Sequence, residues 1–153
     1  MNTLRNARRL VLGSGLLLPA MMVMAIAASA PAAADGLVKV ELLDKADGSQ
    51  AMTLDMNEVK AGKVTFNVTN VSTTKEHEFL FVKTDLAPDQ LPLNADGLRI
   101  DESKLAGVEE LGDLAEGESG TIAADLTPGN YVLFCNLKGH YDAGMFTTLT
   151  VTP

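Results

Sequence analysis

The sequence predicts an all-β protein, a sandwich of about seven to eight short strands with one long acidic interruption. Three observations support this prediction. Several short runs alternate apolar and polar residues, which is the period of a half-buried strand. Glycine, proline and aspartate turn signals separate these runs. The chain has 153 residues, which is the usual size of one domain.

The first mature run, residues 37–43, places Val38, Val40 and Leu42 on one side and polar residues mostly on the other. Asp47-Gly48 follows as a turn signal. After the turn, Met52 and Met56 share a face with Leu54, and we expect both methionines to fill the core.

Five later runs predict further strands, at residues 63–71, 76–83, 121–126, 131–135 and 146–151. In the second of these, His77 shares a face with Phe79 and Phe81. Residues 131–135 are apolar on both faces, which is typical of a strand buried on both sides or facing a site on one.

Residues 85–120 break the pattern with repeated proline, glycine and acidic residues. We expect a long acidic excursion on the surface, partly helical, with a short helix over residues 102–111. Excursions of this length are often functional or mobile, and the sequence does not distinguish the two.

Residues 1–34 have the layout of a secretory signal peptide: Arg5, Arg8 and Arg9 precede an apolar run, and Ala32-Ala-Ala34 offers small residues for cleavage. An uncleaved membrane anchor is the alternative. The arginine pair also loosely matches a twin-arginine export signal. The prediction is a periplasmic or otherwise exported domain over residues 35–153, without stable membrane insertion after cleavage.

The chain carries a formal charge of −8, and removing residues 1–34, which hold three arginines and no acidic residue, makes it −11. Nucleic acid is excluded as a partner, because phosphate binding needs a basic surface. A protein partner with a basic face would be attracted. We expect a monomer.

Cys135, His140 and Met145 bring three soft or borderline metal donors onto one short loop, with four residues in each interval. Gly139 and Gly144 let the backbone turn just before the two later donors. The only cysteine of an exported protein is an interchain bridge, an idle buried thiol or a metal ligand. A blue-copper centre takes two histidines, one cysteine and a weak axial methionine, and the one other histidine is His77. Taken singly, each of these residues is more often a packing residue.

Residues 131–145, YVLFCNLKGHYDAGM, resemble the last strand, ligand loop and axial methionine of the cupredoxins, the small blue-copper proteins, and the turn at residues 126–130 resembles theirs too. The ligand spacing is closest to that of rusticyanin and auracyanin. The resemblance implies a Greek-key β-sandwich with one type 1 copper ion. In that site His77 would be the first imidazole, Cys135 the thiolate, His140 the second imidazole and Met145 the long axial ligand.

Two positions depart from the better-known members. Glu78 stands where plastocyanin and azurin have an asparagine that ties the two ligand segments together, and Glu76 stands where azurin has a glycine. Residues around a metal site tune it, so the reduction potential does not follow from the resemblance.

The resemblance implies a one-electron carrier between redox partners, docking through an apolar patch for which Leu137, Tyr141 and Ala143 are available. A copper-binding protein for copper tolerance or delivery in the periplasm is the alternative. An enzyme is not expected, because a second copper centre would need further histidines. A β-sandwich without metal also stays open.

Overall fold

The computed structural model describes residues 36–153, and the predicted signal peptide and its boundary at residue 35 lie outside the described residues. Within residues 36–153, no helix has the length and apolar character needed to cross a membrane.

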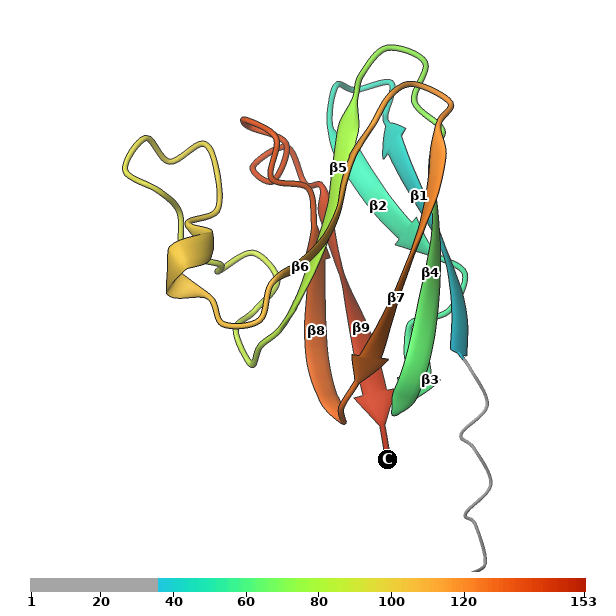
Figure 1. Ribbon diagram of the computed structural model, residues 1–153. Coiled ribbons are helices and arrows are strands. Elements are labelled where there is room, and N and C mark those ends of the chain that lie inside the picture. The colour runs from blue at the N-terminus through green and yellow to red at the C-terminus, as the bar shows by residue number, and fades with distance from the viewer. Residues whose placement is uncertain (1–35) are drawn as a thin grey trace, which may run out of the picture. The chain divides into compact units, whose positions relative to one another are not determined.

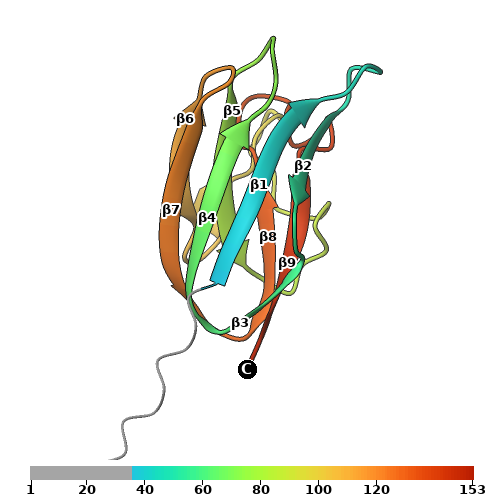
Figure 2. The same ribbon diagram turned by 90° about the vertical axis from the view of Figure 1, so that its right-hand side faces the viewer.

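Nine strands in two sheets make up the described part of the chain (Figure 1). One sheet has the order β2-β1-β4-β7 and the other the order β3-β9-β8-β5-β6. Figure 2 looks onto the first sheet, with β5, β8 and β9 behind it. The strands are β1 Gly36–Asp44, β2 Gln50–Leu54, β3 Glu58–Lys60, β4 Gly62–Asn70, β5 His77–Lys83, β6 Glu109–Leu114, β7 Ser119–Leu126, β8 Gly129–Phe134 and β9 Phe146–Thr152. The predicted all-β sandwich is confirmed.

The alternation in β1 and β4 produces the core between the sheets. The two strands pair in parallel, with Val38 opposite Phe66 and Val40 opposite Val68, and all four side chains are buried. The ring of Phe66 lies 5.4 Å and 5.0 Å from those of two β5 residues, Phe79 and Phe81. This aromatic cluster joins the two sheets, since aromatic pairs add to the free energy gained from burial.

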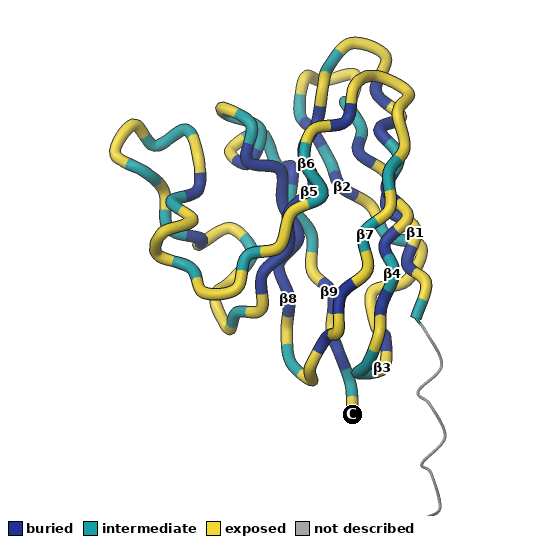
Figure 3. The backbone as a smooth tube through the Cα atoms, in the orientation of Figure 1, coloured by how far each residue is buried: buried dark blue, intermediate teal, exposed yellow. Residues whose placement is uncertain are grey.

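Strand β8 is buried on both faces, as its sequence predicts (Figure 3). Tyr131 and Leu133 face the core between the sheets. Val132 and Phe134 face outward, into a second apolar cluster that includes Leu91 of the segment between β5 and β6. That segment therefore covers the outer face of the five-stranded sheet.

The prediction of a partly helical excursion, with a short helix over residues 102–111, is wrong. A single 3₁₀ turn, η1 Glu102–Lys104, is present, and Glu109–Leu114 forms strand β6, paired with β5. Charged residues suit the exposed edge of a sheet, so the acidic composition fits an edge strand as well as a helix. A register shift opposite Gly112, whose φ is +96°, gives β6 an irregular pattern that hides it from a search for alternation.

Two smaller expectations also change. Met52 is buried in the core, but Met56 lies beyond β2 and is 41% exposed, so it does not fill the core. Strand β3 was not predicted, because it is only three residues long and only Val59 in it is buried.

Candidate metal centre

The four predicted ligands come together at one end of the five-stranded sheet. His77 begins β5, Cys135 directly follows β8, His140 lies in the next loop and Met145 directly precedes β9. Because β8 pairs antiparallel with both β5 and β9, the start of β5, the end of β8 and the start of β9 meet at the same end of the sheet. The strand order thus brings His77 and Cys135, which are 58 positions apart, close together, with their donor atoms within 4.8 Å.

The donor atoms of His77, Cys135 and His140 all lie within 4.8 Å of one another. The two Nδ1 atoms are 3.2 Å apart, and Cys135 Sγ is 3.4 Å from His140 Nδ1. Donors that share one tetrahedral metal ion, each at about 2.0 to 2.3 Å from it, have separations of this size. The three side chains therefore fit a single small cation with a thiolate and two imidazoles.

Met145 is fully buried in the same apolar cluster as Cys135. Its backbone carbonyl accepts a hydrogen bond from Cys135 N–H at 3.1 Å, and its N–H donates to His140 O at 3.0 Å. These bonds hold the methionine beside both ligands of the loop. Its role as the axial ligand remains a prediction.

The loop from Cys135 to Met145 turns where the two glycines were expected to act. Gly139 and Gly144 have φ values of +81° and +96°, a region that other residues rarely adopt. At Gly144 an added Cβ would also lie 3.2 Å from Gln50 O. Gln50 N–H donates to Ala143 O at 2.9 Å, which ties the loop to β2 of the other sheet.

The electrostatics favour neutral imidazoles. Burial, followed by the neighbouring His140, lowers the pKa of His77 to about 4, and burial lowers the pKa of His140. A neutral imidazole is the form that binds a metal. Burial raises the pKa of the Cys135 thiol to about 11, while Glu78 N–H donates to its sulfur at 3.3 Å. A thiol of this kind becomes a thiolate when a cation replaces its proton.

The other ring nitrogen of His77, Nε2, faces Asp44 Oδ1 at 3.6 Å. Both atoms are buried, and neither has a hydrogen-bond partner among the described residues. Ser72 and Thr74 donate hydrogen bonds to the other oxygen of Asp44, and Lys75 Nζ is 3.5 Å from Oδ1. A carboxylate in this position orients a ligating histidine so that Nδ1 points to the metal. Sequence reasoning missed Asp44, because it lies 33 positions before His77 and no local motif marks it.

Glu78 links the two ligand segments through its carboxylate. Its Oε2 accepts a hydrogen bond from Asn136 N–H at 3.2 Å, directly beside Cys135. Plastocyanin and azurin have an asparagine at this position that ties the two ligand segments together. Here Glu78 joins the two segments instead. Burial, assisted by Glu110 and Asp113, raises the pKa of Glu78 to about 7.

The surface around His140 differs from the expected patch at one residue. Leu137, His140 and Ala143 are half-buried. Tyr141 is only 6% exposed, and its hydroxyl donates to Pro88 O at 2.7 Å and accepts from Leu91 N–H at 3.0 Å. Tyr141 is therefore part of the outer apolar cluster and not of the surface patch.

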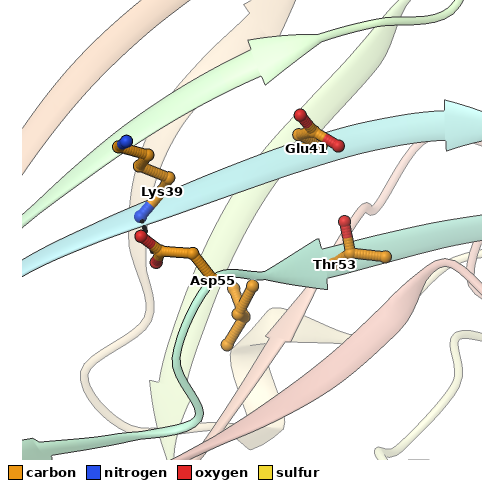
Figure 4. Close-up of a pocket in the computed structure, with 5 residues that line it drawn as sticks. Lys39, Glu41, Thr53 and Asp55 are labelled. Atoms are coloured by element: carbon orange, nitrogen blue, oxygen red, sulfur yellow. Dashed lines mark hydrogen bonds between the residues drawn. The ribbon is translucent and has the colours of Figure 1, made fainter.

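A shallow hollow of about 200 Å³ lies on β1 and β2, lined by Lys39, Glu41, Thr53, Leu54 and Asp55 (Figure 4). Asp55 Oδ1 accepts a hydrogen bond there from Lys39 N–H at 2.8 Å. None of the predicted ligands lines this hollow, so it has no part in the metal centre.

Solved structures of blue-copper proteins share the fold. An auracyanin from Roseiflexus castenholzii is 24% identical with a TM-score of 0.51, and the match covers 79% of this chain and 99% of that one. Rusticyanin from Thiobacillus ferrooxidans is 18% identical with a TM-score of 0.51, and the match covers 78% and 79% of the two chains. At these identities the likeness establishes the fold alone.

Two sequence comparisons are more specific. Auracyanin-B of Chloroflexus aurantiacus is 51% identical over 41 residues, a match that covers 26% of this chain and only 17% of that protein. The family model for the sulfocyanin (SoxE) domain matches residues 44–153, which contain all four predicted ligands.

Cupredoxins are copper electron-transfer proteins that hold one type 1 copper ion, and they are not enzymes. The clustered His77, Cys135 and His140 are the ligand set that such an ion needs. The two-sheet sandwich carries this set at one end. The family model matches residues 44–153, so the chain belongs to the sulfocyanin (SoxE) family of cupredoxins.

Proposed function

We propose that this protein is an exported one-electron carrier whose type 1 copper ion is held by His77, Cys135 and His140, with Met145 as the weak axial ligand. The observation that carries the proposal is the grouping of one thiol and two imidazoles within 4.8 Å. When bound, copper supplies the change between Cu(I) and Cu(II) by which one electron is taken from a donor and passed to an acceptor.

The residues around the site restrict its movement. Asp44 lies against His77, Glu78 N–H donates to the cysteine sulfur, and the backbone of Met145 is bonded on both sides. Donors held in this way change position little between the two oxidation states, which favours rapid electron transfer. His140 is half-buried, whereas His77 and Cys135 are fully buried, so the ring of His140 offers the shortest route from these three ligands to the surface.

The acidic charge of the chain supports docking of a redox protein with a basic face. A small and transient contact would suit a carrier, because the partners must separate after each transfer. We further propose a signal peptide over residues 1–34, a cupredoxin domain over residues 35–153 and a monomeric, periplasmic or otherwise exported protein.

Titration of the purified protein with Cu(II) tests the metal centre. We expect one equivalent of copper to produce an intense visible thiolate-to-copper band, and Cys135→Ser to abolish it. A colourless complex of the unmodified protein would exclude a type 1 site.

Copper tolerance or delivery is the second candidate function, because a buried thiol beside two neutral imidazoles also binds copper tightly whether or not the ion changes oxidation state. Growth of a deletion strain separates the two. Impaired respiratory electron flow with normal copper tolerance supports the carrier, whereas loss of tolerance with intact respiration would overturn it.

A further inference from the structure

The segment between β5 and β6, residues 84–108, is here named the strap. In Figure 1 it is the yellow-green to yellow segment that lies beside the orange-red loop carrying Cys135 and His140. Leu91 and Ile100 of the strap are 4% and 3% exposed and belong to the apolar cluster on the outer face of the sheet. The strap is thus anchored on the sheet by its own buried side chains.

Asn136, the residue after Cys135, is the main contact between the strap and the ligand loop. Its side chain is buried, and Oδ1 accepts a hydrogen bond from Ile100 N–H at 2.6 Å. Its Nδ2 donates to Ile100 O at 3.2 Å and to Glu102 Oε1 at 2.7 Å. The guanidinium of Arg99 donates from Nη1 to Asn136 O at 2.7 Å.

The strap also holds the residues on both sides of His140. Gly139 N–H donates to Leu98 O at 2.8 Å. Tyr141, as described above, is bonded through its hydroxyl to the backbone of Pro88 and Leu91. The residue after Cys135 and the residues on both sides of His140 therefore all contact the strap.

On its other side, Asn136 is held by the carboxylate of Glu78, which follows His77. The asparagine is thereby fixed between β5 and the strap, and all its polar groups are satisfied. A fully satisfied buried polar network favours one arrangement of the groups it contains.

We propose that the strap positions the copper ligands through Asn136 and Arg99, so that Cys135 and His140 adopt their ligating geometry before the metal arrives and keep it in both oxidation states. This inference rests on the proposed copper function. It assigns a role to the part of the chain whose purpose the sequence left open.

Hydrogen exchange of the metal-free protein tests the positioning without copper. We expect Arg99→Ala and Asn136→Ala to speed exchange of the Gly139 amide by about tenfold or more, because each removes hydrogen bonds that involve a charged or buried group. Arg99→Lys is expected to restore part of the protection, since an ammonium group can donate to the same carbonyl. Arg99 is exposed, so we expect its variants to fold even if Asn136→Ala does not.

The copper-loaded variants supply the second readout. Both alanine variants should change the copper hyperfine splitting in electron paramagnetic resonance and shift the reduction potential. Val151→Ala, a core substitution at the opposite end of β9, lowers stability without touching the strap, and Asn67→Ala removes an asparagine from the other sheet. Neither control should change the spectrum or the potential.

The possible results separate the inference from the function. If the unmodified protein forms a blue site but the Arg99 and Asn136 variants match Val151→Ala in exchange, spectrum and potential, the strap is only a structural cover and the inference is overturned. If the unmodified protein forms no blue site, the proposed function fails, while faster Gly139 exchange in the variants would still support positioning of the loop by the strap.

Discussion

Replacing Glu78 with Gln is expected to make the metal-free protein sensitive to acid between pH 7 and 4.5. Two groups beside each other in sequence respond to pH in opposite directions. Burial lowers the pKa of His77 from 6.5 to about 4, and burial with nearby carboxylates raises the pKa of Glu78 from 4.5 to about 7. Gln keeps an oxygen that can accept the Asn136 N–H bond but cannot take up a proton.

The signs follow from which state binds more protons. Between pH 6.5 and 4, unfolded His77 is protonated and folded His77 is not, so acid favours unfolding. Between pH 7 and 4.5, folded Glu78 holds a proton that unfolded Glu78 has released, so acid favours folding. In the unmodified protein the two effects oppose each other over most of this range.

Each difference of pKa corresponds to roughly 2 to 3 kcal/mol in the free energy of unfolding, at 1.36 kcal/mol per pH unit and with some reduction for solvent access. The unmodified protein should therefore lose less stability between pH 7 and 4.5 than Glu78→Gln does, because protonation of Glu78 offsets part of the histidine effect. Glu78→Gln should lose roughly 2 to 3 kcal/mol over the same interval, because only the histidine effect is left. The lowered pKa of His140 acts in the same direction as that of His77.

Urea unfolding of chelator-treated protein at several pH values measures these changes. His77→Gln should show the opposite change and become more stable relative to the unmodified protein as the pH falls to 4.5, because the contribution of His77 is removed. Glu58→Gln, an exposed carboxylate on β3, is the matched control and should follow the unmodified protein. Parallel stability curves for Glu78→Gln and the unmodified protein would refute the opposition of the two groups.

Three further predictions concern the metal and the core. Met145→Leu should keep the blue band and raise the reduction potential, because a weak axial donor is lost; loss of copper binding would make Met145 a primary ligand. Asp44→Asn should weaken copper binding by about 10 to 100-fold and raise the potential, since a negative charge beside His77 is removed; competition titration and voltammetry measure this, and an effect no larger than that of Asp55→Asn would contradict it. Phe66→Ala, between two phenylalanines of β5, should lower the free energy of unfolding by about 3 to 5 kcal/mol in urea, and a loss under 1 kcal/mol would argue against a tightly packed core.

Local pattern was sufficient for the strands that border the core. The alternation in β1 and β4 and the doubly apolar run of β8 each reflect the burial of neighbouring side chains, which is written into consecutive residues. The same holds for the ligand loop, because Cys135, His140 and Met145 lie within eleven residues and Gly139 and Gly144 mark its turns.

The sequence pattern did not predict the structure where strand pairing decided it. Residues 109–114 are acidic and contain a glycine, so they resemble a broken helix, yet they form β6 because β5 offers an unpaired edge. Acidic composition measures exposure to water and does not distinguish an exposed helix from an exposed edge strand.

The sequence by itself therefore determined the sandwich class, most of its strands, the metal-binding chemistry and the family. Only the tertiary structure decided what holds the ligands in place: Asp44 against His77, Glu78 against Asn136, and the strap against Asn136 and Tyr141. The physical reason is distance along the chain. Polar contacts between residues more than 30 positions apart leave no periodic signal, and they form only once the two sheets and the strap have packed together.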